Sequence, residues 1–104
     1  MKLMTKELER QFERAGIERE YETSTIICKF FNPGGLETWY ASEFNGIDLF
    51  FGVVKGFEVE LGYFSLSELQ NTKGKLGLGI ERDLHFTPRL LSEVQKILLD
   101  GGIV

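Results

Sequence analysis

The spacing of apolar residues changes along the chain from a helical period to a strand period and back again. In MTKELERQFERAG the apolar side chains Leu8, Phe12 and Ala15 fall on one side of a helix. Thr5 is suited to cap that helix and Gly16 to end it. The apolar stripe is narrow, so the helix is expected to lie across a surface rather than inside a core.

Four runs in the middle of the chain alternate apolar and polar residues with a period of two, which is typical of strands. They are rich in β-branched and aromatic residues and are separated by turn signals: TIICKFF, LETWYASEF, IDLFFGVV and FEVELGYF. Asn45-Gly46 is a strong hairpin signal, and Lys55-Gly56 marks the next turn. The pattern predicts a four-stranded antiparallel meander.

The last third of the chain returns to a helical period. Ser65 and Glu68 match a capping box, which predicts a short helix to about Asn71. A Gly-rich loop and the stretch IERDLHF follow, and IERDLHF is expected to form a fifth strand. Thr87-Pro88 is expected to start a final helix, because proline suits the first helical position.

These elements predict an α+β fold in a single domain spanning residues 1–104. Its centre is an antiparallel β-meander of about five strands, with N-terminal, short middle and C-terminal helices. A two-residue turn at the first hairpin would set Glu43 opposite Asp48 and Trp39 opposite Gly52. Both sheet faces then carry apolar residues, which leaves two explanations: a bulge at Gly56, or cover on both sides by helices or a partner. We expect partial cover on both sides.

Composition narrows the class of protein. The chain has 104 residues, 42% of them hydrophobic, a net charge of −4 and one cysteine. A lone cysteine, with neither a leader nor an apolar run of ~20 residues, predicts a soluble, cytoplasmic protein that is not in a membrane. The basic residues Lys6, Arg10 and Arg14 alternate with glutamates, so nucleic-acid binding is not expected.

The fifth predicted strand carries the first candidate site. Glu81, Asp83 and His85 are spaced two apart, so in a strand their side chains would share one face and could bind a metal ion or exchange protons. A metal site needs three or four ligands from several elements, and no second His or Cys cluster exists. A half-buried strand with Ile80, Leu84 and Phe86 facing inward explains the same pattern. That interpretation is favoured, and a small enzyme or metal-binding protein is the alternative function.

Arg82 interrupts the apolar side of the same stretch. A long cationic side chain can lie along apolar surface with its charge in water, or it can pair with an acid. Glu58 and Glu60 are the candidates for such a structural ion pair.

The first hairpin carries the second candidate site, made of Trp39, Glu43, Asp48 and Phe50. The repulsion between the opposed carboxylates of Glu43 and Asp48 would be relieved by a bound cation or a shared proton, or the two side chains would point apart into water. Trp39 would either shield Gly52 or form a binding hot spot.

The segments KLMTKEL, TWY, ELGYFSLSEL and LGLGIERD together resemble the bacterial domain-of-unknown-function family 2958. The resemblance covers almost the whole chain. It implies a small protein of the kind borne by plasmids, conjugative elements and phages, with no established activity. No catalytic residue can therefore be carried over.

These observations predict a small acidic protein-interaction module associated with mobile genetic elements, as an accessory or counter-defence protein. The expected contact surface is Trp39, Glu43, Asp48 and Phe50. A protein partner is expected, a homodimer is left open, and no cofactor is expected.

Overall fold

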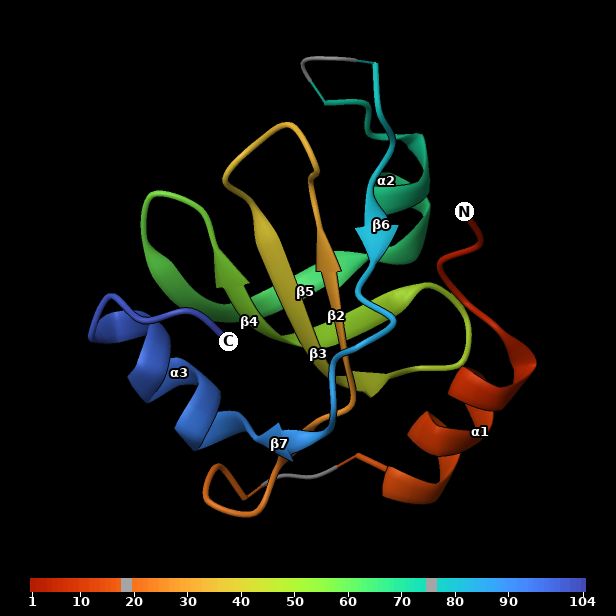
Figure 1. Cartoon of the computed structure of the whole chain (residues 1–104). Helices are drawn as coiled ribbons and strands as arrows, with labels where there is room; N and C mark the ends of the chain where they lie inside the picture. Colours follow the sequence, from red (N-terminus) through yellow and green to blue (C-terminus); the bar gives the residue numbers. More distant parts are fainter. Residues whose placement is uncertain (18–19, 75–76) are drawn as a thin grey trace.

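The computed structural model describes residues 1–17, 20–74 and 77–104 (Figure 1). Two residues of the predicted Gly-rich loop, 75 and 76, lie outside this range. The described chain forms helices α1 (Lys6–Ala15), α2 (Leu66–Asn71) and α3 (Leu91–Leu99) and strands β1 (Thr25–Ile26), β2 (Cys28–Phe31), β3 (Thr38–Phe44), β4 (Leu49–Lys55), β5 (Val59–Ser65), β6 (Glu81–Arg82) and β7 (Arg89–Leu90).

The main sheet is antiparallel, and its strands follow the order β5-β4-β3-β2-β6. The four strands β2 to β5 form the predicted meander, and β6 crosses over to pair with β2 rather than with β5. A separate two-stranded sheet joins β1 and β7. The expected α+β class, with a meander of about five strands and three helices, is confirmed.

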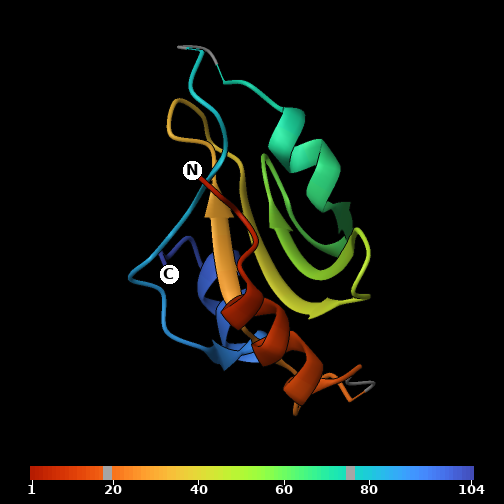
Figure 2. The same ribbon diagram turned by 90° about the vertical axis from the view of Figure 1, so that its right-hand side faces the viewer.

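Helices cover both faces of the curved sheet, and each face has its own apolar core (Figure 2). Residues of α1 and α2 pack on one face, around the ring of Phe50, which stacks against Phe64 and contacts Phe12. Residues of α3 pack on the other face, against Tyr40 and Val53. This arrangement explains why both faces of the predicted meander carry apolar residues.

The helix ends follow the local signals. The Thr5 hydroxyl accepts a hydrogen bond from the Leu8 N–H (3.1 Å), and Gly16 ends α1 with a φ of 67°. The Ser65 hydroxyl accepts from the Glu68 N–H (3.2 Å), as a capping box requires. These three cap positions were predicted from sequence.

The predicted register of the first hairpin is wrong. A bulge between Ala41 and Glu43 adds a residue to β3, so Glu43 lies opposite Phe51 rather than Asp48. Trp39 lies opposite Val54, and the residue opposite Gly52 is Ala41. The turn is also longer than two residues, because the Asn45 side-chain oxygen accepts hydrogen bonds from the backbone of residues 47, 48 and 49.

The predicted start of the last helix is also wrong. Arg89 and Leu90 are extended because they pair with β1, and the helix begins only at Leu91. The Leu91 N–H donates to the Ser24 backbone oxygen (2.8 Å), which holds this junction against β1. Within the described ranges, none of the helices has both the length and the apolar composition needed to cross a bilayer.

Candidate functional site

The predicted row of Glu81, Asp83 and His85 does not form. Strand β6 ends at Arg82, and the Asp83 carboxylate accepts a hydrogen bond from the His85 N–H (2.9 Å), which turns the chain. His85 and Leu84 are exposed, so the prediction that Leu84 faces the core is also wrong. Among the described residues, no group of three or more His, Cys, Asp and Glu is placed to hold a metal ion.

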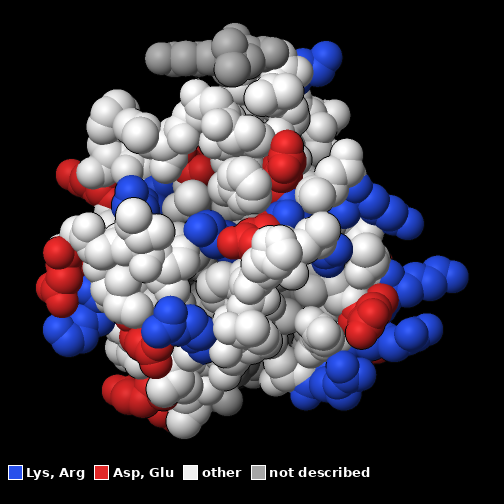
Figure 3. Space-filling model, in the orientation of Figure 1, with Lys and Arg blue, Asp and Glu red and all other residues white. Residues whose placement is uncertain are grey.

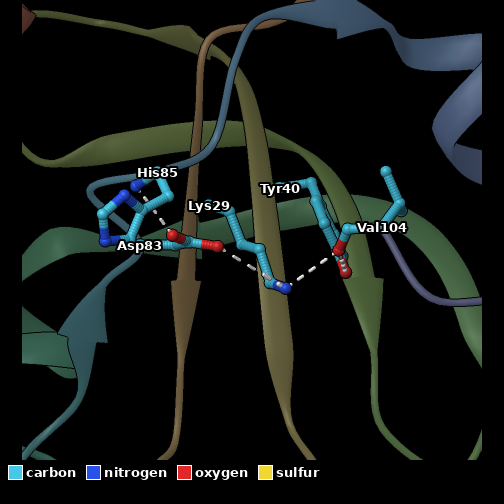
Figure 4. Close-up of polar contacts among 5 residues, drawn as sticks. All are labelled: Lys29, Tyr40, Asp83, His85 and Val104. Carbon is cyan, nitrogen blue, oxygen red and sulfur yellow. Dashed lines mark hydrogen bonds and ion pairs between the residues drawn. The ribbon is translucent and has the colours of Figure 1, made fainter.

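Asp83 instead belongs to a polar cluster on the α3 side of the sheet (Figure 4). Its carboxylate lies 3.9 Å from the Lys29 ammonium, which also donates to the Val104 backbone oxygen (2.8 Å). The Tyr40 hydroxyl donates to the same Val104 oxygen (3.0 Å). Burial raises the pKa of Tyr40, so its hydroxyl stays a donor. The arrangement ties the segment after α3 to β2 and β3.

The four residues of the second predicted site are not a common exposed surface. Phe50 is 0% exposed and lies at the centre of the aromatic core, where it cannot touch a partner. Trp39 is half-buried against that same core. Glu43 is half-buried on β3, opposite Phe51 rather than Asp48.

Asp48 holds the start of α2. Its carboxylate accepts hydrogen bonds from the Ser65 hydroxyl (2.7 Å), the Ser67 hydroxyl (2.8 Å) and the Ser67 N–H (2.8 Å). These hydrogen bonds lower the pKa of Asp48, with the Ser65 hydroxyl as the largest cause. The carboxylate therefore acts as a second cap for α2, and no cation is needed to explain its placement.

Arg82 does not form the expected ion pair with Glu58 or Glu60. It lies on β6, whereas Glu60 lies on β5 at the opposite edge of the sheet, and no ion pair of Arg82 with a described residue is recorded. Its Nε is buried without a hydrogen-bond partner among the described residues. The side chain lines a cavity of about 390 Å³ between α1 and the chain around β6.

Cys28, the one cysteine of the chain, also lines this cavity. Burial raises the pKa of its thiol to about 12, although the nearby charge of Arg82 acts in the opposite direction. At neutral pH the group is a protonated thiol and a poor nucleophile.

Strand β5 forms an open edge of the sheet that was not predicted from the sequence. The Leu66 N–H donates to the Asp48 backbone oxygen (2.8 Å), so these two residues are a hydrogen-bonded pair at the end of the ladder between β5 and β4. Hydrogen-bonded and non-hydrogen-bonded pairs alternate along an antiparallel ladder, so Phe64, Gly62 and Glu60 also bond to β4. The backbone groups of Val59, Leu61 and Tyr63 therefore point away from β4. No backbone hydrogen bond to these outward groups is recorded from any described residue.

Two exposed apolar side chains lie along this edge. Leu61 is 41% exposed and Tyr63 is 69% exposed, and the Tyr63 ring packs edge-on against Phe51 at 5.0 Å between centroids. They share a face with Val59, because residues two apart in a strand point the same way. We call the outward backbone of Val59, Leu61 and Tyr63, with these side chains, the β5 edge. One sequence signal was available: VELGYFS contains neither Lys nor Pro, the residues that commonly protect edges.

The two edge strands of the sheet, β6 and β5, differ in how far other segments cover them. At the opposite end, β6 has only two residues, and the outward Arg82 N–H donates to the Met1 sulfur (3.1 Å). The N-terminal segment thus covers that edge, while β5, seven residues long, has no such cover recorded among the described residues.

On the face shown in Figure 3, Lys and Arg side chains gather on the side where α1 lies, with acidic side chains beside them.

These observations define the class: an α+β protein with helices on both faces of a curved antiparallel sheet and a long edge strand, β5, that the described residues leave open. The chain belongs to the family described as protein of unknown function (DUF2958), whose model matches residues 3–99. No curated protein and no solved structure matches the chain.

Proposed function

We propose that this is a protein-interaction module that accepts an extended strand of a partner along the β5 edge. The observation that carries the proposal is the seven-residue edge strand whose outward backbone groups have no recorded hydrogen bond among the described residues. An added strand supplies main-chain hydrogen bonds, and alternate side-chain contacts supply specificity.

Two features support this interpretation over an incidental exposed strand. Natural sheets protect long edges with charged side chains, lysine above all, with proline, with bulges or by keeping the strand short; β5 has seven residues, no lysine, no proline and no bulge against β4, and Glu60 is its one charged side chain. Of the exposed side chains on the edge, Tyr63 is of a type enriched in binding hot spots, and Leu61 adds apolar surface of the kind found in interface cores. The β5 edge replaces the surface first expected, because Trp39 and Glu43 lie on β3, two strands away.

A photo-crosslinking amino acid placed at Leu61 or Tyr63 tests the proposal in the producing cell. We expect both positions to form adducts with an extended segment of the same partner, identified by mass spectrometry. Leu99 is the control position, because it is 63% exposed and apolar but lies on α3, away from the edge. Absence of adducts at 61 and 63, or equal labelling from 99, would overturn the proposal.

The family resemblance adds a setting to this proposal. We propose that the protein is carried by plasmids, conjugative elements or phages and acts there as an accessory or counter-defence protein in the cytoplasm. The test is the location of its genes: we expect them on transmissible elements, and a consistent location among chromosomal housekeeping genes would contradict the setting.

A second candidate function is small-ligand binding in the cavity beside Arg82. The specific observation is the buried Nε of Arg82, which has no partner among the described residues, because an orphaned buried donor costs about 1–3 kcal/mol unless an acceptor satisfies it. A titration with acetate, followed by NMR shifts of Cys28 and Leu8, tests it. Shifts that disappear in Arg82→Leu support a ligand site, and unchanged spectra indicate water alone.

A further inference from the structure

We propose that the strand received by the β5 edge is β5 of a second copy of this chain, paired antiparallel and centred on Leu61. This inference rests on the proposed function of the edge and names its partner. It predicts a two-fold symmetric dimer in which the two sheets join into one. Such an interface is self-complementary, because each contact occurs twice.

The outward backbone groups restrict the register. Val59, Leu61 and Tyr63 turn their N–H and C=O groups outward before the chain reaches Ser65, the cap of α2, so these three residues form the hydrogen-bonded pairs. Centring the pair on Leu61 sets each Leu61 opposite the other and each Val59 opposite the Tyr63 of the second copy. This register uses the whole open length of the edge.

Charge selects the same register. In it, Glu60 lies opposite Gly62 of the second copy, which has no side chain and has open space where a Cβ would lie. Sliding the strands toward Val59 would place Glu60 opposite Glu60 or Glu58, and like charges directly opposite each other are unfavourable. Sliding them toward Tyr63 would leave Val59 opposite Ser65, where the backbone turns into α2.

The exposed apolar side chains gain cover in this register. Leu61, Tyr63 and Val59 of the two copies form one row on the α3 side of the joined sheet. Phe57, in the turn between β4 and β5, is 99% exposed. It precedes Val59 by two residues and therefore comes to the C-terminal end of the second copy's β5. The Phe57 ring, which is exposed to water in the single chain, can therefore pack against the second copy in the dimer.

Engineered cysteines test the register directly. Two residues in a hydrogen-bonded pair have Cα atoms about 5.5 Å apart, within the ~4.4–6.8 Å range that a disulfide spans. The variant Leu61→Cys is therefore expected to oxidise to a disulfide-linked dimer. The native Cys28 does not compete, because its thiol is buried and its pKa is raised to about 12.

Tyr63→Cys is the matched control on the same strand and face. In the proposed register its two copies are displaced by four residues along the paired strands, about 13 Å, which a disulfide cannot span. We expect cross-linking of Leu61→Cys and none of Tyr63→Cys. The reverse result would overturn the register, and no cross-linking of either variant at millimolar concentration would overturn the dimer.

A charge pair at Gly62 gives a second measurement that needs no oxidation. Gly62→Lys sets a lysine opposite each Glu60, and Gly62→Glu sets a glutamate there, while the open space at Gly62 accommodates both. In sedimentation equilibrium we expect the dissociation constant to fall roughly fivefold for Gly62→Lys and to rise roughly fivefold for Gly62→Glu. Equal effects of the two variants would overturn the inference.

The dimer and the proposed function fail in different ways. A chain that stays monomeric, while positions 61 and 63 still photo-crosslink to another protein, overturns the dimer and leaves the function of the edge standing. Failure of both measurements removes the function as well.

Discussion

Single glycines decide how closely the strands of this sheet approach one another. At Gly52 an added Cβ would lie 1.8 Å from the Tyr40 backbone oxygen, a distance that no real side chain occupies. Gly62 lies directly across the ladder from Gly52, yet a Cβ added there would have nothing within 4 Å. Position 52 therefore requires glycine, whereas position 62 has room for a side chain, although both residues lie in extended strands.

Alanine at these two positions gives the first prediction. Gly52→Ala forces β3 and β4 apart, and we expect it to lower the free energy of unfolding by about 3 kcal/mol or more. Gly62→Ala meets open space and is expected to change it by less than about 1 kcal/mol. Urea denaturation followed by circular dichroism checks both variants. Equal losses would show that the close approach at Gly52 is wrong.

Asp48 gives a prediction about pH. Its pKa is lowered below 3.8 in the folded protein by the hydrogen bonds from Ser65 and Ser67. A lowered folded pKa means that the carboxylate stabilises the fold above pH ~3.8 and that this stability is lost as pH falls through the folded value. We therefore expect Asp48→Asn to lower the melting temperature at pH 7 and the difference from the native chain to shrink below pH ~4. A difference that is constant with pH would contradict this assignment.

At the scale of elements, the polar cluster of Lys29, Tyr40 and Asp83 fastens the chain after α3 to the sheet. The two donors reach one Val104 oxygen from neighbouring strands, β2 and β3. Lys29 is only 15% exposed, so its charge needs these partners. The cluster explains how a lysine can occupy an inward position on β2.

Removing the lysine tests the role of the cluster. Lys29→Met removes the charge and the donor, and we expect a loss of about 2 kcal/mol in the free energy of unfolding, with faster amide exchange at residues 102–104. Tyr40→Phe, which removes only a hydroxyl, is the milder comparison at about 1 kcal/mol. An unchanged exchange rate in Lys29→Met would show that the cluster does not hold this segment.

Elements whose signals are local could be predicted from the sequence. The caps at Thr5, Gly16 and Ser65 depend on residues within one helical turn, and the meander depends on alternation within each strand. The bulge after Ala41 pairs Phe44 with Phe50, and both rings pack in the same core; these are contacts between segments, which alternation within one strand does not report. The β5 edge was also missed, because the order of the strands in the sheet depends on contacts between distant segments.

The position of β6 decides which strand is exposed. Had IERDLHF paired beside β5, the last strand of the meander would have been internal and its outward backbone groups would have been satisfied. Instead it pairs with β2, through Phe30 opposite Arg82 and Phe31 opposite Glu81. Strand order depends on contacts between distant segments, and period and turn signals within one sequence do not report it. The Asp83 turn that ends β6 is equally hidden, because the strand pattern continues through His85.

At the scale of the whole molecule, helices shield both faces of the sheet and the N-terminal segment shields the β6 end. The β5 edge is left as the long stretch of strand for which no described segment supplies backbone partners. An isolated chain with such an edge is prone to pair with another strand. This open edge is the feature of the fold that supports the proposal of strand addition.

Amide hydrogen exchange along β5, followed by NMR at low and high protein concentration, tests this account most directly. At low concentration the account predicts an alternating pattern, with the outward amides of Val59, Leu61 and Tyr63 exchanging fast and those of Glu60 and Gly62 protected by β4. At high concentration the outward amides should become protected as a second strand pairs. Exchange of the outward amides that is slow in the isolated chain, or fast at every concentration and in the presence of any partner, would contradict an edge that pairs.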